Sequence, residues 1–212
     1  MPPTVAPTSK GETRRLEILR AAALTLVDRG YGDTRIAEVA ERANVSTALL
    51  IYYFGTREQM LLESLKLSES SFYSQAEAKM RSASTAIDRL DLLVEICCVE
   101  DDEGKTLRGL WFELWSQAQR HADVAEARAV HDDQWRDLIT HVVREGQFNG
   151  EVNPSVDARR FAVALAALLD GLSVQVGLAD NEVTPDYARR LAMDFITDQL
   201  GVTRKGTSEK RG

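Results

Sequence analysis

The residues at positions 46–54, STALLIYYF, are of types that can contact DNA. Ser46 is a favourable helix N-cap, and the four-residue spacing of Leu50 and Phe54 predicts that both point into a core. A helix with small residues at its start and tyrosines at its end fits the major groove, which admits one α-helix. We therefore predict that the other side chains of this helix contact DNA. They are Ser46, Thr47, Ala48, Leu49, Ile51, Tyr52 and Tyr53.

A second short amphipathic segment precedes this helix at the spacing of a helix-turn-helix. Thr34 is its predicted N-cap, and Ile36 and Val39 lie on one face. The segment 43–45 interrupts the helical pattern, and Asn44 is the residue expected at positive φ. The pair predicts a helix-turn-helix, although similar two-helix turns also occur in all-α proteins that bind no nucleic acid.

From about residue 14 to residue 62 the sequence resembles the DNA-binding domain of tetracycline-repressor-type (TetR family) regulators. In that family an opening helix ends in a Gly-aromatic step, and an Ile/Val-Ala pair lies in the second helix. A Val-Ser step then precedes, by three variable residues, a Leu-aromatic-Tyr-His-Phe motif. Gly or Pro, Ser or Thr, Lys or Arg, and Glu then follow. The matching residues here are Gly30-Tyr31, Val39-Ala40, Val45-Ser46 and Leu50-Ile51-Tyr52-Tyr53-Phe54-Gly55-Thr56-Arg57-Glu58.

Three positions depart from the family pattern. Asn44 stands where Gly is usual, Ile51 replaces an aromatic residue, and Tyr53 replaces the His. Ile51 cannot donate a hydrogen bond to a phosphate, whereas Tyr53 supplies a donor nearby. The resemblance also implies that the start of the helix after Gly55 touches phosphate. The further DNA contacts that we predict are Thr34, Arg35, Thr56 and Arg57.

Charge is distributed unevenly along the chain, whose formal net charge is −7. Residues 1–57 hold eight basic and six acidic residues, a net +2, whereas residues 58–203 carry a net −12. This asymmetry favours a DNA-reading head on an acidic body. Because +2 is a weak attraction, affinity for DNA has to come from individually placed contacts.

Helical periodicity continues through the remaining chain, and we find no strand signal or repeat. We therefore predict an all-α protein of about nine helices. An N-terminal three-helix, helix-turn-helix DNA-binding domain is joined to a helical ligand-binding and dimerisation domain. The predicted parts are a disordered arm at 1–9, the DNA-binding domain at 10–57, the effector-binding and dimerisation domain at 58–203 and a basic, flexible tail at 204–212.

Cap and loop signals predict several helix boundaries. An Asn-Pro pair at 153–154 is typical of a helix start, so we expect a helix over 155–178. A Thr-Pro pair at 184–185 gives the same signal for the last helix, which Gly201 should end. The acidic stretch 100–104 is a predicted loop.

The predicted helix at 155–178 is apolar on every side from Phe161 to Leu178, where Asp170 is its only charge. Its length approaches that of a membrane span, but its Ala, Gly and polar residues argue against one. Such a helix has to be covered on all sides, and a second copy of the chain could cover one of them in a four-helix bundle. The resemblance implies the same homodimer. The predicted interface residues are Phe161, Leu165, Leu168, Leu172, Val176, Leu191 and Phe195.

Aromatic residues indicate a candidate effector pocket. The segment 110–118, LWFELWSQA, resembles the C-terminal domain of the betaine-regulator-like branch of the family. Trp111 and Trp115 lie one turn apart and, with Phe112 and Trp135, could line a pocket, although core packing also accounts for buried aromatic residues. Because aromatic faces attract cations and the body is acidic, we hypothesise a cationic or quaternary-amine effector.

Signals of catalysis and metal binding are absent from the sequence. His121, His131 and His141 are ten residues apart, which rotates each about 280° from the last around a helix. There is no Gly-rich phosphate loop or nucleophile elbow, so we predict no enzyme, catalytic residue, metal site or cofactor. The adjacent Cys97 and Cys98 lie in an apolar run, which predicts reduced core cysteines; a redox sensor is the alternative.

The function predicted from these features is that of a cytoplasmic, dimeric transcriptional repressor. It binds a near-palindromic operator in double-stranded DNA and is released by an unidentified small-molecule effector, and it has no membrane partner. The N-terminal segment has no apolar region of the kind found in signal peptides. Two alternatives stay open: an activator with the same head, and an all-α small-molecule carrier or enzyme whose head binds no DNA.

Overall fold

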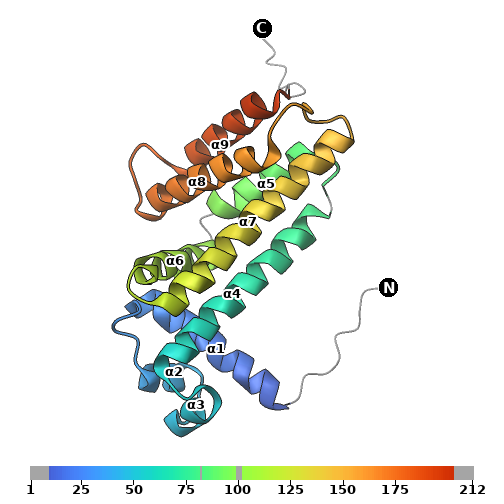
Figure 1. Ribbon diagram of the computed structural model, residues 1–212. Helices are drawn as coiled ribbons and strands as arrows, with labels where there is room; N and C mark the ends of the chain where they lie inside the picture. The colour runs from blue at the N-terminus through green and yellow to red at the C-terminus, as the bar shows by residue number, and fades with distance from the viewer. Residues whose placement is uncertain (1–9, 82, 99–101, 203–212) are drawn as a thin grey trace. The chain divides into compact units, whose positions relative to one another are not determined.

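Nine α-helices and no strand make up the part of the chain that the computed structural model describes, residues 10–81, 83–98 and 102–202 (Figure 1). The prediction of an all-α fold is confirmed. The predicted arm at 1–9 and tail at 204–212 lie outside the described residues. The helices are α1 (Lys10–Arg29), α2 (Ile36–Arg42), α3 (Thr47–Phe54), α4 (Arg57–Met80), α5 (Ala86–Cys98), α6 (Asp102–Ala118), α7 (Ala122–Phe148), α8 (Ala158–Gly177) and α9 (Pro185–Leu200).

Contacts group the chain into two compact units. Unit 1 comprises Met1–Phe72 and Gly109–Arg128, and unit 2 comprises Tyr73–Arg108 and Ala129–Gly212. Helices α4, α6 and α7 each contribute residues to both units. The units therefore differ from the domains predicted from sequence, because the second part of α6 and the start of α7 belong with the N-terminal helices.

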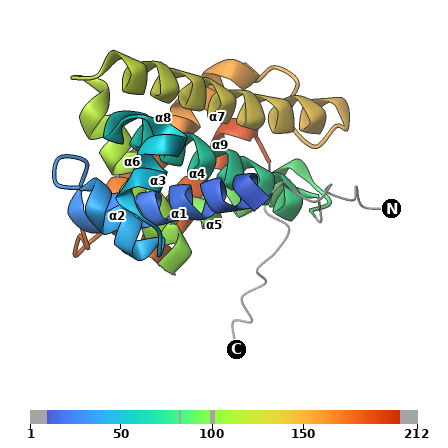
Figure 2. The ribbon, with the colours of Figure 1, turned by 90° about the horizontal axis from the view of Figure 1, so that it is seen from below.

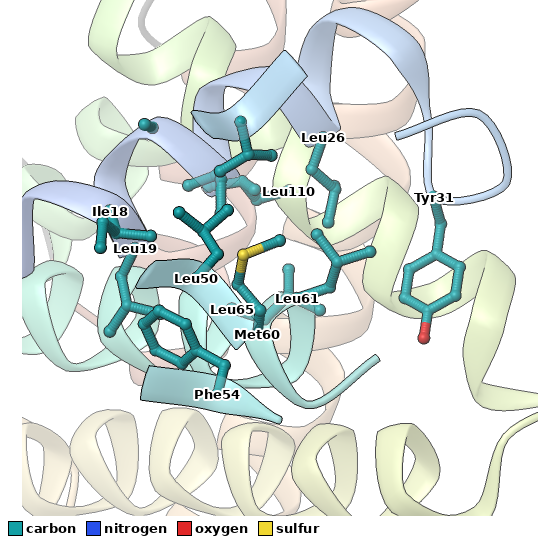
Figure 3. Close-up of a cluster of buried hydrophobic side chains, with 14 of the residues drawn as sticks. Ile18, Leu19, Leu26, Tyr31, Leu50, Phe54, Met60, Leu61, Leu65 and Leu110 are labelled. Carbon is teal, nitrogen blue, oxygen red and sulfur yellow. The ribbon is translucent and has the colours of Figure 1, made fainter. Parts of the chain in front are cut away.

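Unit 1 is built around one apolar core (Figure 3). Leu26 of α1, Leu50 of α3 and Leu61 of α4 are almost completely buried there, and α6 adds Leu110. Burying each such side chain contributes roughly 2–3 kcal/mol. Helices as short as α2 and α3 are unstable in isolation, so this packing is what keeps them folded.

Unit 2 contains α5, α8 and α9 packed against one another (Figure 1). Arg189 of α9 donates two hydrogen bonds to the Asp91 carboxylate of α5, at 2.8 and 3.1 Å. Helix α7 approaches α5 closely at Gly146, where a Cβ atom would stand 2.7 Å from the Cβ of Ala86. A larger residue at this position would force α5 and α7 apart.

Helix α8 starts later than its sequence signal predicted. Its N-cap is Asp157, whose carboxylate accepts hydrogen bonds from the backbone N–H groups of Arg159 and Arg160 at 3.0 Å each. Asn153 instead closes a turn, in which its Oδ1 accepts the N–H of Ser155 at 2.9 Å. The predicted start at 153–154 is wrong, because the asparagine caps a turn and the aspartate four residues later caps the helix.

The other boundary predictions have mixed outcomes. Thr184 caps α9 through its side chain, and Gly201 ends that helix with a φ of +66°, as predicted. The predicted loop at 100–104 is too long, because α6 begins at Asp102. Positions 99–101 lie outside the described residues.

Helix α8 is long and apolar enough, by length and composition alone, to cross a membrane; core helices pass the same test. Four of its side chains, Phe161, Leu165, Leu172 and Val176, are 5% exposed or less. We predicted these four for the dimer interface, and the structure corrects this. They face inward in unit 2, in which α8 packs against α5 and α9, so a second subunit could reach little of their surface.

Candidate DNA interface

A tight turn joins α2 to α3, and α1 lies next to them (Figure 2). Asn44 has a φ of +51°, as predicted, and the N–H of Val45 donates to the carbonyl of Ala40 at 2.9 Å. Ser46 caps α3: its hydroxyl accepts the N–H of Leu49 at 3.3 Å. The asparagine can occupy this left-handed position because its side chain tolerates positive φ.

Helix α3 has one buried side and one open side. Leu50 and Phe54 are buried in the core of unit 1, as their spacing predicted (Figure 3). On the open side Tyr52 is 80% exposed and Ile51 is 47% exposed. Of the other predicted contacts on this helix, Ser46, Thr47 and Ala48 are exposed, and Leu49 and Tyr53 are half-buried. The open side is the surface that a duplex could reach.

The end of α3 is held by its aromatic residues. The ring of Tyr53 lies 5.5 Å from that of Tyr52 and 6.1 Å from that of Phe54, measured between centroids. Arg15 of α1 places its guanidinium 5.2 Å from the Phe54 centroid and also pairs with Glu63 of α4. These contacts tie α3 to α1 and α4, and they make Tyr53 less available to DNA than Tyr52.

The start of α2 differs from the prediction. Its N-cap residue is Arg35, which is exposed, and the backbone N–H of Arg35 donates to the Glu38 carboxylate at 3.3 Å. Thr34 is only 1% exposed, and its hydroxyl donates to the carbonyl of Gly30 at 2.8 Å. Thr34 therefore stabilises the turn before α2. It neither caps this helix nor offers a surface to DNA, which corrects both predictions.

The start of α4 carries Thr56 and Arg57. Thr56 is exposed, and its hydroxyl accepts the N–H of Gln59 at 3.1 Å, which is the geometry of a cap. The guanidinium of Arg57 turns inward: its Nε donates to the carbonyl of Thr34 at 2.6 Å, and a terminal nitrogen donates to the carbonyl of Tyr31. A phosphate contact by Arg57 remains a prediction, but this side chain already holds the α1–α2 turn.

Charges around Arg57 are balanced locally. Arg57 pairs with Glu58 at 3.0 Å, and its guanidinium lies 5.0 Å from the centroid of the Tyr31 ring. The backbone N–H of Glu58 and then Arg57 lower the pKa of the Glu58 carboxyl, so it is ionised at neutral pH. Burial raises the pKa of the Tyr31 hydroxyl, so it is neutral. Glu58 thus offsets the attraction of Arg57 for phosphate.

Helix α6 supplies a residue that sequence reasoning did not single out. The Glu113 carboxylate accepts the backbone N–H of Tyr31 at 2.8 Å. The Tyr31 ring lies at the edge of the core with its hydroxyl directed away from it (Figure 3), 5.5 Å from the ring of His121. The available signal was the place of Glu113, an acidic residue between Phe112 and Leu114 in an apolar stripe.

The residues of the predicted effector pocket are divided between the units. Trp111, Phe112 and Trp115 belong to unit 1 and Trp135 to unit 2, so a pocket shared by all four remains a prediction. The rings of Phe112 and Trp115 lie 5.9 Å apart, inclined at 43°. The indole N–H of Trp115 is buried and has no acceptor among the described residues.

Within the described ranges, no group of three or more His, Cys, Asp and Glu side chains is arranged to hold a metal ion. Cys97 and Cys98 are both buried. Burial raises the pKa of the Cys98 thiol to about 11, and burial, followed by Cys98 and Asp170, raises the pKa of the Cys97 thiol well above its ordinary value. Because the thiolate is the reactive form, both cysteines are poor nucleophiles at neutral pH.

Two family models match the chain. Residues 18–64 match the model described as bacterial regulatory proteins, tetR family. Residues 86–201, more than half of the chain, match the model described as BetI-type transcriptional repressor, C-terminal. The first match covers the helix-turn-helix, and the second begins with α5 and ends just after α9.

The similar proteins and solved structures are also transcriptional regulators. The HTH-type transcriptional regulator BetI of Rhizobium meliloti (strain 1021) is 26% identical over 193 residues, which are 91% of this chain and 92% of that protein. A regulator structure from Saccharomonospora viridis, solved in complex with choline, is 27% identical with a TM-score of 0.81, over 89% of this chain and 98% of that one. A TetR-family regulator structure from Rhodococcus sp. is 26% identical with a TM-score of 0.78, over 89% and 99%.

Proposed function

This chain belongs to the tetR family of bacterial transcriptional regulators, with a C-terminal part of the BetI type, and from this premise we propose how it works. It is a cytoplasmic homodimer that represses transcription from a near-palindromic operator. A small-molecule effector bound by the body favours a conformation in which the two heads no longer fit successive major grooves. Repression is then relieved.

The observation that carries this proposal is the open side of α3. Thr47 and Ala48 are exposed in its first turn, where small side chains permit a close approach to base edges. Tyr52, the most exposed aromatic residue of this helix, has a hydroxyl that can donate to a phosphate. Because Leu50 and Phe54 fix the opposite side in the core, α3 presents these groups on a rigid support.

Phosphate contacts would come from exposed groups at helix starts. Arg35 is exposed at the start of α2, and Thr56 is exposed at the start of α4. Helix N-termini attract phosphate through their free N–H groups and their dipole. These contacts suit a head whose net charge of +2 over residues 1–57 gives little general attraction.

The dimer would form through the outer faces of α8 and α9, which pack together in unit 2 (Figure 1). Leu168, Leu191 and Phe195, all predicted from sequence, keep accessible surface. Gly171 has nothing within 4 Å of the place where a Cβ would stand, so a partner helix can approach closely. The accompanying exposed residues on these helices are Val163, Ala164, Ala167, Gln175 and Tyr187. Two such pairs make a four-helix bundle.

The proposed effector is a quaternary amine such as choline. Its trimethylammonium group would lie against the faces of Trp111, Phe112, Trp115 or Trp135, and the net −12 of residues 58–203 favours a cation. The buried indole N–H of Trp115 could donate to the ligand hydroxyl. Support also comes from the regulator of Saccharomonospora viridis, whose structure contains choline.

Operator binding tests the proposed function. The dimer should shift a duplex taken from DNA flanking its own reading frame, with an affinity that falls steeply as salt rises. Thr47→Val should change the preferred base at one operator position by roughly tenfold. Tyr52→Phe should instead weaken binding to every operator variant alike. A Thr47 variant that lost affinity equally for all bases would remove this residue from base readout.

Calorimetry tests the effector. Titration with choline should give saturable binding, whereas 3,3-dimethyl-1-butanol, its uncharged isostere, should bind at least tenfold more weakly. The reason is that cation–π attraction of about 0.5–2 kcal/mol per ring disappears with the charge. The variant Trp115→Phe keeps an aromatic ring to contact the cation but removes the indole N–H that we propose donates to the ligand hydroxyl. Equal affinity for the two ligands, or no heat with either, would rule out the proposed quaternary amine.

A further inference from the structure

We propose that Glu113 is a positioning residue, through which α6 sets the orientation of the turn that leads into α2 and α3. By holding the backbone N–H of Tyr31, its carboxylate links α6 directly to the DNA-reading helices. This inference rests on the proposed function, because the orientation of α3 matters only if this helix reads DNA. All the residues involved belong to unit 1.

The α1–α2 turn, residues 30–35, is held from two sides. Arg57 at the start of α4 donates to the carbonyls of Tyr31 and Thr34. Glu113 on α6 accepts the N–H of Tyr31 at 2.8 Å. Arg57 thus binds backbone carbonyls of this short segment, and Glu113 binds a backbone N–H of the same segment. Arg35, the N-cap of α2, also belongs to this segment. Moving either support would move the start of α2.

The contact with Glu113 is close. Gly30 has a φ of +80°, and a Cβ atom there would stand 3.4 Å from Oε1 of Glu113. Without the Glu113 carboxylate, the backbone N–H of Tyr31 would lose its protein partner. This loss matters because Tyr31 is buried. A hydrogen bond forms only when the acceptor lies about 3 Å from the donor and in line with the N–H, so this side-chain oxygen has to be in the correct place.

A second contact fixes α6 on the same side. Gly109 precedes Glu113 by one helical turn, so the two positions share a face. A Cβ at Gly109 would stand 2.9 Å from Cγ1 of Val27 on α1, which means that the backbone of α6 touches this β-branched side chain. Helix α6 is therefore set against α1 at Gly109 and against the turn at Glu113.

Because α6 is one continuous helix, its movement would also move Glu113. The helix runs without interruption from Asp102 to Ala118, and its residues from Gly109 onward, Glu113 among them, belong to unit 1. A shift or rotation of this helix displaces the carboxylate of Glu113 together with its backbone. Because α2 and α3 follow the turn directly, they would be displaced with it, and the base contacts of α3 would be lost before its phosphate contacts.

The test uses the full-length dimer and separates the effect of the side-chain length of Glu113 from the effect of its charge. Glu113→Gln keeps the side-chain length and an oxygen acceptor, whereas Glu113→Asp keeps the charge but is one methylene shorter. Fluorescence anisotropy measures affinity for operator DNA and for a scrambled duplex of equal length. We expect Glu113→Asp to lower the operator-to-scrambled ratio about tenfold with little change in scrambled binding. We expect Glu113→Gln to stay within about threefold of wild type.

Controls and a second readout complete the experiment. Glu126→Gln changes the same charge at an exposed position of α7 in unit 1 and should change neither affinity. Amide hydrogen exchange should be faster at Tyr31 in Glu113→Asp, while the amides of the buried part of α3 keep their protection. A general loss of structure would instead accelerate exchange throughout unit 1.

The outcomes distinguish the inference from the function on which it rests. A wild-type protein that bound operator and scrambled DNA equally would overturn both. If wild type discriminates and Glu113→Asp retains its full ratio, only the positioning role of Glu113 is wrong. A Glu113→Gln variant that lost as much as Glu113→Asp would also overturn it, because the role would then belong to the charge.

Discussion

Gly171→Arg should give a folded protein that is monomeric at micromolar concentration and binds operator DNA at least a hundredfold more weakly than wild type. A Cβ at Gly171 would have no atom of another described part of the subunit within 4 Å, so the position itself can accept a side chain. Across the proposed two-fold axis, however, it would insert a charge into an apolar interface. The effect on DNA arises because the second head no longer binds intramolecularly, which is worth roughly 10²–10⁴ in avidity.

The matched control is Gly171→Ala. Within a helix, alanine is more favourable than glycine by about 1 kcal/mol, so this variant should unfold at a slightly higher temperature and remain dimeric unless the helices touch at the glycine itself. Light scattering gives the molecular mass, and circular dichroism shows whether each variant is folded. A Gly171→Arg protein that stayed dimeric would place the interface elsewhere.

Arg57→Ala should destabilise the protein by about 3 kcal/mol and abolish specific operator binding. The guanidinium holds the carbonyls of Tyr31 and Thr34, and both residues are buried. Removing it leaves these acceptors without a partner, at about 1–3 kcal/mol each before any relaxation. Chemical denaturation followed by circular dichroism measures the loss of stability, and operator titration measures the loss of affinity.

Arg57→Lys separates the structural role from the predicted phosphate contact. Lysine keeps the positive charge but cannot hold two carbonyls and Glu58 in one fixed fork. If Arg57 acts mainly on the turn, Arg57→Lys should lose stability much as alanine does while the salt dependence of DNA binding is unchanged. If Arg57 binds phosphate, Arg57→Ala should reduce the salt slope by about one, and Arg57→Lys should preserve both slope and stability.

The local features of the DNA-reading segment could be predicted from sequence because neighbouring residues decide them. Asn44 occupies positive φ, and Ser46 caps α3. Leu50 and Phe54 are inward because their four-residue spacing places them on one side of a helix. The same local signals failed at Thr34 and Asn153, each of which forms a turn one or more residues before the actual cap. Capping residues are also turn-forming residues, so their presence does not locate the first helical residue.

What the sequence by itself determined is the all-α class, the family and the reading helix, since these follow from periodicity, caps and an ordered motif. Tertiary structure alone decided which side of α8 is buried, because a helix that is apolar all round has no pattern to distinguish its faces. It also decided that Arg57 donates to two backbone carbonyls and that Glu113 accepts a backbone N–H. Every residue carries such backbone groups, so only the packing of distant helices determines which of them a charged side chain will meet.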